Sequence, residues 1–372
     1  MPPRKANSET HFLDRPDVAS LDRSQMFSHI ALLPGQLISA LALDPEPLPD
    51  LSRPVSNVLV CGVGGSAIGG EIASCLVRDE LTVPFQVSRG TRPPAYASPR
   101  TLAFVISYSG DTFETLSIFH ELRRAGAQIV AVCSGGCLAD QARLYRVPLI
   151  PLPTGMPPRS AIGYTSIPLV RQLTAFGLCQ DPAQGLRAAS RGLETFLCKL
   201  DLSSPYRTNL AKQIADTLSG RVVSVYGSQG NLDVVARRWA GQIAENGKQI
   251  AFWNAIPEML HNEIVGWSHP RGFLKMRTAV VLRDSADPPR IGKLCDDLEG
   301  QLLAQQSRLS VQAPGGSRWE KIFGLVLLGD LVSSYVALLN GEDPTPIFAI
   351  EAHKARVAAL PSDPESNAAV DD

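Results

Sequence analysis

A glycine-rich segment of the chain has the composition of an anion-binding turn. CGVGGSAIGGE (61–71) follows the apolar run VLVCG (58–62), and GGEIASCLV (69–77) has helical spacing. Glycines between a strand and a helix let the backbone approach an anion, and the free N–H groups at the start of the helix favour negative charge. Gly65 and Ser66 stand at this junction, so backbone N–H groups and a hydroxyl could bind the phosphate of a sugar phosphate.

Other interpretations of this segment stay open, and one is excluded. Gly62-x-Gly64-x-x-Ala67 matches a dinucleotide-binding fingerprint, but that fingerprint expects an acidic residue near the end of the second strand, where this chain has Ser88-Arg89. A tight turn with a purely structural role is the other alternative. A nucleotide-binding P-loop is excluded, because no Gly-Lys-Ser/Thr follows the glycines.

A second segment rich in hydroxyl groups, SYSGDTFET (107–115), lies between the strand-like run TLAFVIS (101–107) and a predicted helix. Neutral hydroxyls and free helix N–H groups can hold a phosphate without a cluster of cations. Ligands bind at the carboxyl ends of strands in open α/β sheets, so this segment and the first are expected to form one crevice. The three hydroxyl groups are those of Ser107, Ser109 and Thr112.

Helix capping is the alternative interpretation of the second segment. Ser109 or Asp111 could be the N-cap, with Glu114 in the first turn of the helix. Capping would account for one or two of these polar residues but not for all of them. Phosphate binding is therefore the favoured interpretation.

A carboxylate and a histidine occur close together in AENGKQIAFWNAIPEMLHNEIVGW (244–267). Glu245 ends a predicted helix in an apolar setting, and His261 follows 16 residues later. Partial burial raises the pKa of a carboxyl group toward neutrality, so the two residues could act as base and acid in a proton transfer. A solvated helix end and a structural histidine are the alternative.

Two cationic residues have less local support. Arg159 lies in the proline-restricted loop PPRSAIGY (157–164), and Lys354 lies in DPTPIFAIEAHKARVAAL (343–360), a predicted helix that begins with proline. Surface arginines and lysines are usually solvated and without function, so spacing alone assigns no role to either.

The chain shows no pattern typical of a metal site. Cys133-x-x-x-Cys137 has no partner pair, and the six histidines have no paired spacing, which favours structural thiols. No metal and no cofactor are therefore expected.

Composition and charge exclude several classes of protein. The chain has 35 basic and 36 acidic residues, so no overall positive field attracts nucleic acid or an anionic membrane. Seven cysteines, an odd number, argue against a secreted disulfide scaffold, and the N-terminus lacks the apolar core of a signal peptide. The apolar run 324–339 is short for a bilayer and contains Asp330, which favours a buried core helix. A cytoplasmic protein with neither nucleic-acid nor membrane partners is expected.

The elements that would position these residues form two α/β units. Short apolar runs alternate with helical segments, which predicts doubly wound parallel sheets covered by helices on both faces. The expected strands are FQVSR (85–89), QIVAVCS (128–134), RVPLIPL (146–152), RVVSVYG (221–227), TAVVLRD (278–284) and SRLSVQA (307–313), besides the two runs named above. Helices are expected over 26–43, 181–219, 232–246 and 318–339.

Two parts of the chain begin alike. Residues 58–73 and 222–240 both run strand, Gly, Ser, Gly, helix, which suggests two related subdomains. The predicted organisation is a partly helical extension (1–50), a first subdomain (51–190), a second (205–360) and an acidic tail (361–372).

Taken together, these segments resemble the bifunctional phosphoglucose/phosphomannose isomerase family, a branch of the sugar isomerase (SIS) domain proteins. The resemblance runs from about residue 50 to 360. GGSAIGG (64–70) and SYSGDT (107–112) are similar to the two phosphate-binding turns, and PPRSAIGY to the arginine loop. The block 244–267, which contains NAIPEMLHNEIVGW, is the most specific match. The family implies two SIS-type subdomains, each a doubly wound, flavodoxin-like sheet.

The resemblance also implies a role for each residue. Glu245 would be the base that moves a proton between C1 and C2, and His261 would open the sugar ring from the neighbouring subunit of a homodimer. Arg159 would stabilise the enediolate, and Lys354 would assist at the ring oxygen or hold the chain of the sugar. The phosphate would be bound by Gly65, Ser66, Ser107, Ser109 and Thr112.

The implied reaction is the interconversion of glucose 6-phosphate and mannose 6-phosphate with fructose 6-phosphate through a cis-enediol. The two aldoses differ only at C2, so one base can serve both. The alternatives are a non-catalytic sugar-phosphate-binding protein, an isomerase of another sugar phosphate, and an NADP-dependent oxidoreductase that would use Gly62, Gly64 and Arg89.

Overall fold

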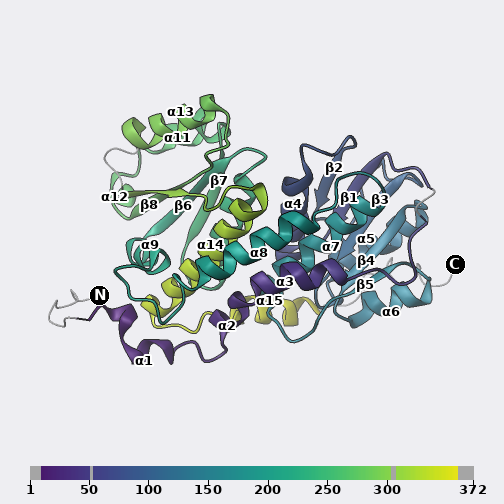
Figure 1. Ribbon diagram of the computed structural model, residues 1–372, viewed down its shortest axis with the longest axis horizontal. Helices are drawn as coiled ribbons and strands as arrows, with labels where there is room; N and C mark the ends of the chain where they lie inside the picture. The colour runs from purple at the N-terminus through teal and green to yellow at the C-terminus, as the bar shows by residue number, and fades with distance from the viewer. Residues whose placement is uncertain (1–9, 51–52, 303–306, 359–372) are drawn as a thin grey trace.

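The computed structural model describes residues 10–50, 53–302 and 307–358, which form two parallel β-sheets flanked by helices (Figure 1). The first sheet has the strand order β2-β1-β3-β4-β5, the order of flavodoxin-like doubly wound folds. All of its pairings are parallel. Its strands are β1 (Asn57–Cys61), β2 (Phe85–Ser88), β3 (Thr101–Ile106), β4 (Gln128–Cys133) and β5 (Leu149–Pro151).

Helices cover both faces of the first sheet because its strands are apolar on both sides. Successive side chains point to opposite faces, so Val58 and Leu59 lie in two separate apolar clusters, one on each face of the sheet. One face packs against α4 (Gly64–Val77) and α7 (Ile162–Ala175), and the other against α5 (Phe113–Arg124) and α6 (Gly136–Leu144).

The second sheet repeats this topology with one strand fewer. Its order is β7-β6-β8-β9, again entirely parallel. Its strands are β6 (Val222–Ser228), β7 (Ala251–Ile256), β8 (Arg277–Arg283) and β9 (Ser307–Gln312). The predicted doubly wound class is confirmed for both sheets. Strand β7 was missed because its residues were interpreted only as carriers of catalytic groups.

The remaining helices lie around and between the sheets. Besides two helices of the N-terminal extension described below, they are α1 (Pro16–Ala19), α8 (Ala183–Leu197), α9 (Leu210–Leu218), α10 (Asp233–Glu245), α11 (Glu263–Gly266), α12 (Arg271–Leu274), α13 (Pro289–Asp297), α14 (Arg318–Asn340) and α15 (Phe348–Ala358). Short 3₁₀ segments are η1 (Phe12–Asp14), η2 (Ala40–Ala42), η3 (Pro158–Ser160) and η4 (Glu258–His261), and η5 (Leu298–Leu302) is a π-helical turn. The segment predicted as helical over 181–219 is two helices, α8 and α9.

Helix α14 is the centre of the largest apolar cluster. It begins with a capping box between Ser317 and Glu320 and ends at Gly341, which has the left-handed conformation (φ 78°). It is long and apolar enough to cross a membrane, but every residue of that apolar stretch is buried inside the protein. Figure 1 shows α14 and α8 running beside each other between the two sheets. Strands of the second sheet and helices α4 and α7, which cover the first sheet, both belong to this cluster, so the subdomain limits given above stay a prediction. The acidic tail predicted over 361–372 lies outside the described residues.

The N-terminal extension packs on its own chain. The helix expected over 26–43 is broken into α2 (Met26–Ala31), α3 (Leu33–Ser39) and η2, with Pro34 in the first turn of α3. The apolar side chains of this segment join the cluster around α14. Asp14 accepts a hydrogen bond from Lys212 Nζ at 2.9 Å, which fixes the start of the extension to α9.

Candidate active site

The two predicted phosphate-binding turns lie side by side. They follow β1 and β3, which are neighbours in the first sheet. A Cβ atom on Gly62 would come within 2.8 Å of the carbonyl oxygen of Ile106 and 3.1 Å of Ser66 Cβ, so only glycine permits this approach. Ser66 and Ser107 are both buried at this edge. The two turns are therefore adjacent, and a single crevice formed by both stays a prediction.

The hydroxyl groups of the second turn bond to one another and to backbone amides. Ser107 Oγ lies 2.9 Å from Thr112 Oγ1 and accepts a hydrogen bond from the N–H of Gly110 at 3.0 Å. Ser109 Oγ, on an exposed residue, accepts from the N–H of Asp111 at 3.3 Å.

The capping alternative is wrong about the N-cap residue, although Glu114 lies in the first turn of α5 as that alternative expected. Helix α5 has Thr112 as its N-cap, and no side chain makes a capping hydrogen bond there. The Asp111 carboxylate instead accepts from the N–H of Cys137 at 2.9 Å, so it ties the turn to α6.

Arg159 is buried beside the first turn. A Cβ atom on Gly65 would lie 3.4 Å from Arg159 Cα, so the arginine loop rests on the glycine turn. Arg159 Nε donates to Asn246 Oδ1 at 2.6 Å, and Nη2 donates to the carbonyl oxygens of Pro344 and Thr345 at 3.0 and 2.6 Å. Burial lowers the pKa of the Arg159 guanidinium, and the nearby Glu245 carboxylate opposes that change.

Glu245 stands at the end of α10 with its carboxylate facing Arg159. Its Oε2 lies 3.9 Å from Arg159 Nε, and its side chain is 32% exposed while that of Arg159 is 5% exposed. The carboxylate is thus open to a small ligand but lies beside a buried cation. The structure brings together three of the predicted site positions, those of Gly65, Arg159 and Glu245.

A pocket of about 220 Å³ contains these three residues. It opens between α4 of the first subdomain and α10 of the second. Its lining residues are Gly64, Gly65, Ile68, Arg89, Arg159, Arg237, Arg238, Gly241, Gln242 and Glu245. The four arginines still outnumber the carboxylates around them, Glu245 and the Glu71 and Asp330 side chains that pair with three of them, and this positive excess favours an anionic ligand.

Sequence reasoning missed most of the arginines in this pocket. Arg238, Gln242 and Glu245 are spaced i, i+4 and i+7 along α10, so a helix predicted over 232–246 already placed them on one face. Arg89 was considered only in the dinucleotide-binding interpretation. No local signal identifies Arg237 as a lining residue, because its place depends on how the subdomains meet.

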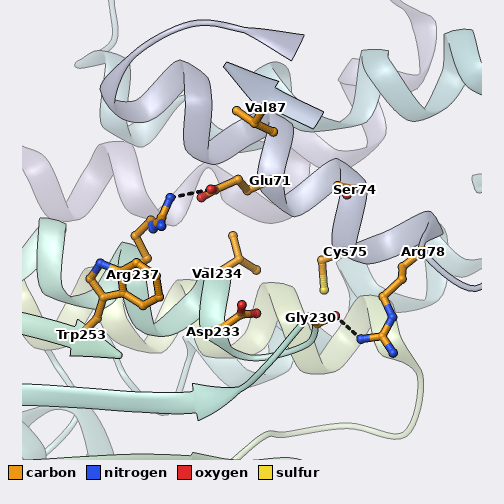
Figure 2. A pocket seen from close by; sticks show the side chains of 10 residues that line it. All are labelled: Glu71, Ser74, Cys75, Arg78, Val87, Gly230, Asp233, Val234, Arg237 and Trp253. Atoms are coloured by element: carbon orange, nitrogen blue, oxygen red, sulfur yellow. Dashed lines mark hydrogen bonds and ion pairs between the residues drawn. The ribbon is translucent and has the colours of Figure 1, made fainter. Parts of the chain in front are cut away.

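Glu71 of α4 joins the two subdomains next to the pocket. Its Oε1 pairs with Arg89 Nη2 at 2.8 Å and with Arg237 Nη1 at 2.6 Å, and the Arg237 guanidinium lies 4.1 Å from the centre of the Trp253 ring. Figure 2 shows Glu71 and Arg237 pointing toward one another across a second pocket of about 240 Å³. The ion pairs hold the two arginines at the rim of the candidate site.

Lys248 lies just beyond Glu245 in a left-handed conformation (φ 52°). Its Nζ donates to the carbonyl oxygens of Glu245 and Pro344, each at 2.8 Å. Burial, and then the positive charge of Arg159, lower the pKa of Lys248 to about 8. The lysine ties the end of α10 to the segment that leads into α15.

His261 and Lys354 do not line the pocket within one chain. His261 is exposed at the end of η4, and Lys354 is exposed on α15. The segment that carries His261 is anchored to the second sheet through Glu263, which accepts hydrogen bonds from Tyr226, Asn254, Trp267 and Arg277.

The corresponding turn of the second subdomain is filled by the chain's own carboxylates. Asp287 Oδ1 accepts from Ser228 Oγ at 2.8 Å and from Asn231 Nδ2 at 3.0 Å. Asp284 accepts from Asn231 at 3.0 Å and from Lys321 Nζ at 2.6 Å. Two carboxylates at this turn repel a phosphate, so the repeated fold holds one candidate anion site rather than two.

The described residues contain no group of three or more His, Cys, Asp or Glu side chains placed to hold a metal ion. The seven cysteines are all free, and four of them are buried.

Comparison with known proteins identifies the family. The bacterial phospho-glucose isomerase C-terminal SIS domain family matches residues 207–357. A bifunctional phosphoglucose/phosphomannose isomerase of Caldicellulosiruptor bescii is 34% identical over 337 residues, which cover 90% of this chain and 99% of that protein. One from Aquifex aeolicus is 32% identical over 301 residues, 80% of this chain and 89% of that protein.

A solved structure shows the same fold. A glucose-6-phosphate isomerase like protein from Thermus thermophilus superposes with a TM-score of 0.59 at 20% identity, covering 93% of this chain and 99% of that one. The resemblance found in the sequence motifs is confirmed by the two relatives. The chain belongs to the bifunctional phosphoglucose/phosphomannose isomerase family.

Proposed function

We propose that this chain is an aldose–ketose isomerase that interconverts glucose 6-phosphate and mannose 6-phosphate with fructose 6-phosphate. The observation that carries the proposal is the partly exposed Glu245 carboxylate, which lies 3.9 Å from the buried Arg159 in a pocket bordered by the glycine turn. The chain's relatives are named for the same two activities.

The substrate phosphate is bound at the paired turns of the first subdomain. Helix α4 begins at Gly64, so its free N–H groups and the positive end of its dipole meet the phosphate beside Gly65 and Ser66. Ser107, Ser109 and Thr112 supply hydroxyl groups from the neighbouring turn. Phosphate binding then orients the reacting carbons toward Glu245.

Glu245 transfers the proton between the two carbons. It removes the proton from C2 of the aldose while the carbonyl oxygen at C1 becomes a hydroxyl, which gives the cis-enediol. Loss of the hydroxyl proton at C2 and return of the carried proton to C1 give the ketose. Arg159 stabilises the negative charge that develops on the oxygens. Because the aldoses differ only at C2, both pass through the same enediol.

Ring opening is assigned to His261 of a second copy, and Lys354 assists at the ring oxygen. Three features support a homodimer. Within one chain His261 does not line the pocket. Residues 348–357 of α15 are all exposed, and a helix of 11 residues has little stability without packing. Phe252 on the edge strand β7 and Val265 on α11 are 58% and 75% exposed.

The free cysteines are compatible with the cytoplasm as the location.

The test is to incubate the purified protein with mannose 6-phosphate, and separately with glucose 6-phosphate, in the presence of EDTA, and to measure fructose 6-phosphate. Product from both sugars is the expected result. Product from glucose 6-phosphate alone would contradict the dual activity. Saturable binding of fructose 6-phosphate without conversion would replace the proposal with a non-catalytic binding protein.

A thermal shift with NADP⁺ tests the remaining alternative. The proposed function predicts no shift. A shift that depends on Arg89 would favour the oxidoreductase instead.

A further inference from the structure

One charged residue lies in the middle of the apolar helix α14. The Asp330 side chain is 4% exposed, and the residues on either side of it, Gly329 and Leu331, are packed in the core. A carboxylate in such a place loses its hydration, so burial raises the pKa of Asp330, and Arg238 opposes that rise. Asp330 therefore carries a desolvation penalty that an apolar residue at this position would not have.

Asp330 holds Arg238 of α10 with two hydrogen bonds. Arg238 Nε donates to Oδ1 at 3.0 Å and Nη2 donates to Oδ2 at 2.7 Å, a fork that fixes the guanidinium plane. Gln242, one turn further along α10, donates to Oδ1 at 2.9 Å. The carboxylate thus fixes the face of α10 that lines the candidate site.

The fork reaches the arginine loop directly. Arg238 Nη2 also donates to the backbone carbonyl oxygen of Arg159 at 2.7 Å. The same nitrogen therefore contacts the buried carboxylate and the main chain of the residue that faces Glu245. Any movement of the Arg238 guanidinium would release this hydrogen bond to the loop.

A second route leads from the same turn of α14 to the Arg159 side chain. Ser333 Oγ donates to the carbonyl oxygen of Asp330 at 2.8 Å and accepts from Asn246 Nδ2 at 3.0 Å. Asn246 Oδ1 in turn accepts from Arg159 Nε at 2.6 Å. One turn of α14 thus restrains both the backbone and the guanidinium of Arg159.

A stability role does not explain this arrangement well. Buried ion pairs contribute little net stability compared with apolar residues of similar volume, because both charges lose their water. A pair that adds little net stability over apolar residues of similar volume, and that touches the candidate site, is better explained by the geometry it imposes.

We propose that Asp330 is a positioning residue for the isomerisation: through Arg238 it holds the arginine loop so that the Arg159 guanidinium stays beside Glu245. This inference depends on the proposed function of Arg159. Asp330 itself lies behind the site and does not line the pocket.

The test compares Asp330→Asn with Asp284→Asn. Both carboxylates belong to buried ion pairs, and the Asp284–Lys321 pair, with side chains 6% exposed, does not reach the pocket. For Asp330→Asn we expect kcat per folded protein to fall about 10-fold or more, because a displacement of roughly 1 Å at a catalytic group has such effects. We expect KM to change less, because the phosphate turns are outside the network. Asp284→Asn should lose thermal stability without this loss of kcat.

A second readout does not depend on activity. Phenylglyoxal modifies accessible guanidinium groups, and peptide mapping measures the modification of Arg159. Arg159 should be protected in the wild-type protein and in Asp284→Asn, and modified faster in Asp330→Asn. If Asp330→Asn does not fold, Arg238→Lys replaces it, since one ammonium cannot reproduce the fork to Asp330 and Arg159.

The outcomes separate the two proposals. Unchanged kcat and unchanged protection of Arg159 in Asp330→Asn would overturn the positioning role. Losses of kcat that follow the loss of thermal stability equally in Asp330→Asn and Asp284→Asn would also overturn the positioning role. A wild-type protein without isomerase activity would refute the proposed function, and the labelling experiment would still decide whether Asp330 holds Arg159.

Discussion

At the scale of single residues, the central relation is that between Glu245 and Arg159. One is a partly exposed carboxylate and the other a buried guanidinium, 3.9 Å apart. The cation favours negative charge on a bound enediolate, while the open side of the carboxylate leaves room for a carbon-bound proton to be transferred.

Glu245→Gln should lower kcat for both aldoses by about 10²-fold or more, because the amide cannot accept a proton. The binding of fructose 6-phosphate should persist, since the phosphate turns are unchanged. The control is Glu194→Gln, a substitution on the exposed face of α8. Turnover by Glu245→Gln within a few-fold of wild type would refute the assigned mechanism.

Lys248 makes stability depend on pH. Its pKa is lowered from 10.5 to about 8 in the folded protein, so between these values the unfolded chain binds a proton that the folded chain has released. Stability from this residue therefore rises as the pH increases from about 8 to about 10.5. Urea unfolding should show that the wild type gains stability relative to Lys248→Met across this range. A difference between the two proteins that stays constant from neutral pH upward would contradict the prediction.

At the scale of elements, close packing of α4 against α7 fixes the glycine turn. A Cβ atom on Gly69 would lie 2.4 Å from Thr165 Oγ1 and 2.7 Å from its carbonyl oxygen. The second contact is with backbone, so the helices would have to separate. Because α4 begins at the glycine turn, this separation would also displace Gly65 and Ser66.

Gly69→Ala should therefore destabilise the protein by about 1–3 kcal/mol and raise KM for the sugar phosphates. Gly292→Ala is the matched control. Gly292 lies within α13, a Cβ atom there meets nothing within 4 Å, and alanine is the better helix former. Its stability should be unchanged or slightly higher. Urea unfolding measures the stability of both variants, and steady-state kinetics measure their KM. Equal stability and equal KM in the two variants would show that the α4–α7 contact does not hold the glycine turn in place.

At the scale of the whole molecule, the site combines parts that are distant in sequence. The turns belong to the first sheet, Glu245 ends a helix of the second subdomain, and the carbonyls of Pro344 and Thr345 close the far side of Arg159. A homodimer adds His261 from a second copy under the proposed function.

Complementation tests this shared site. In a heterodimer of Glu245→Gln and His261→Asn subunits, one site contains both substitutions and the other contains neither. Random assembly of two inactive variants should therefore restore about one quarter of wild-type activity, because half of the dimers are mixed and each has one intact site. Each variant assayed alone is the control. If His261 served its own chain, the mixed dimers would be as inactive as the separate variants.

The sequence by itself determined the local features of this protein. Strand, turn and helix follow one another along the chain, so neighbouring residues were enough to predict the parallel sheets. They were also enough to predict the glycine turn, the hydroxyl-rich turn and the end of α10 at Glu245. Local sequence patterns did not predict features that depend on contacts between residues distant in sequence. Edge strand β7 was missed because its residues were interpreted only as carriers of catalytic groups. Its apolar run is interrupted by Asn254, and only its last two residues, Ala255 and Ile256, are buried.

Only the tertiary structure decided what surrounds Glu245. Arg237 and Arg89 meet through Glu71, and Asp330 meets Arg238 from a helix 92 residues away in sequence. No spacing rule relates such residues, because their approach depends on how α4, α10 and the second sheet pack around α14. The apolar pattern of that helix predicted its burial, but only packing shows which residues its buried carboxylate, Asp330, holds in place.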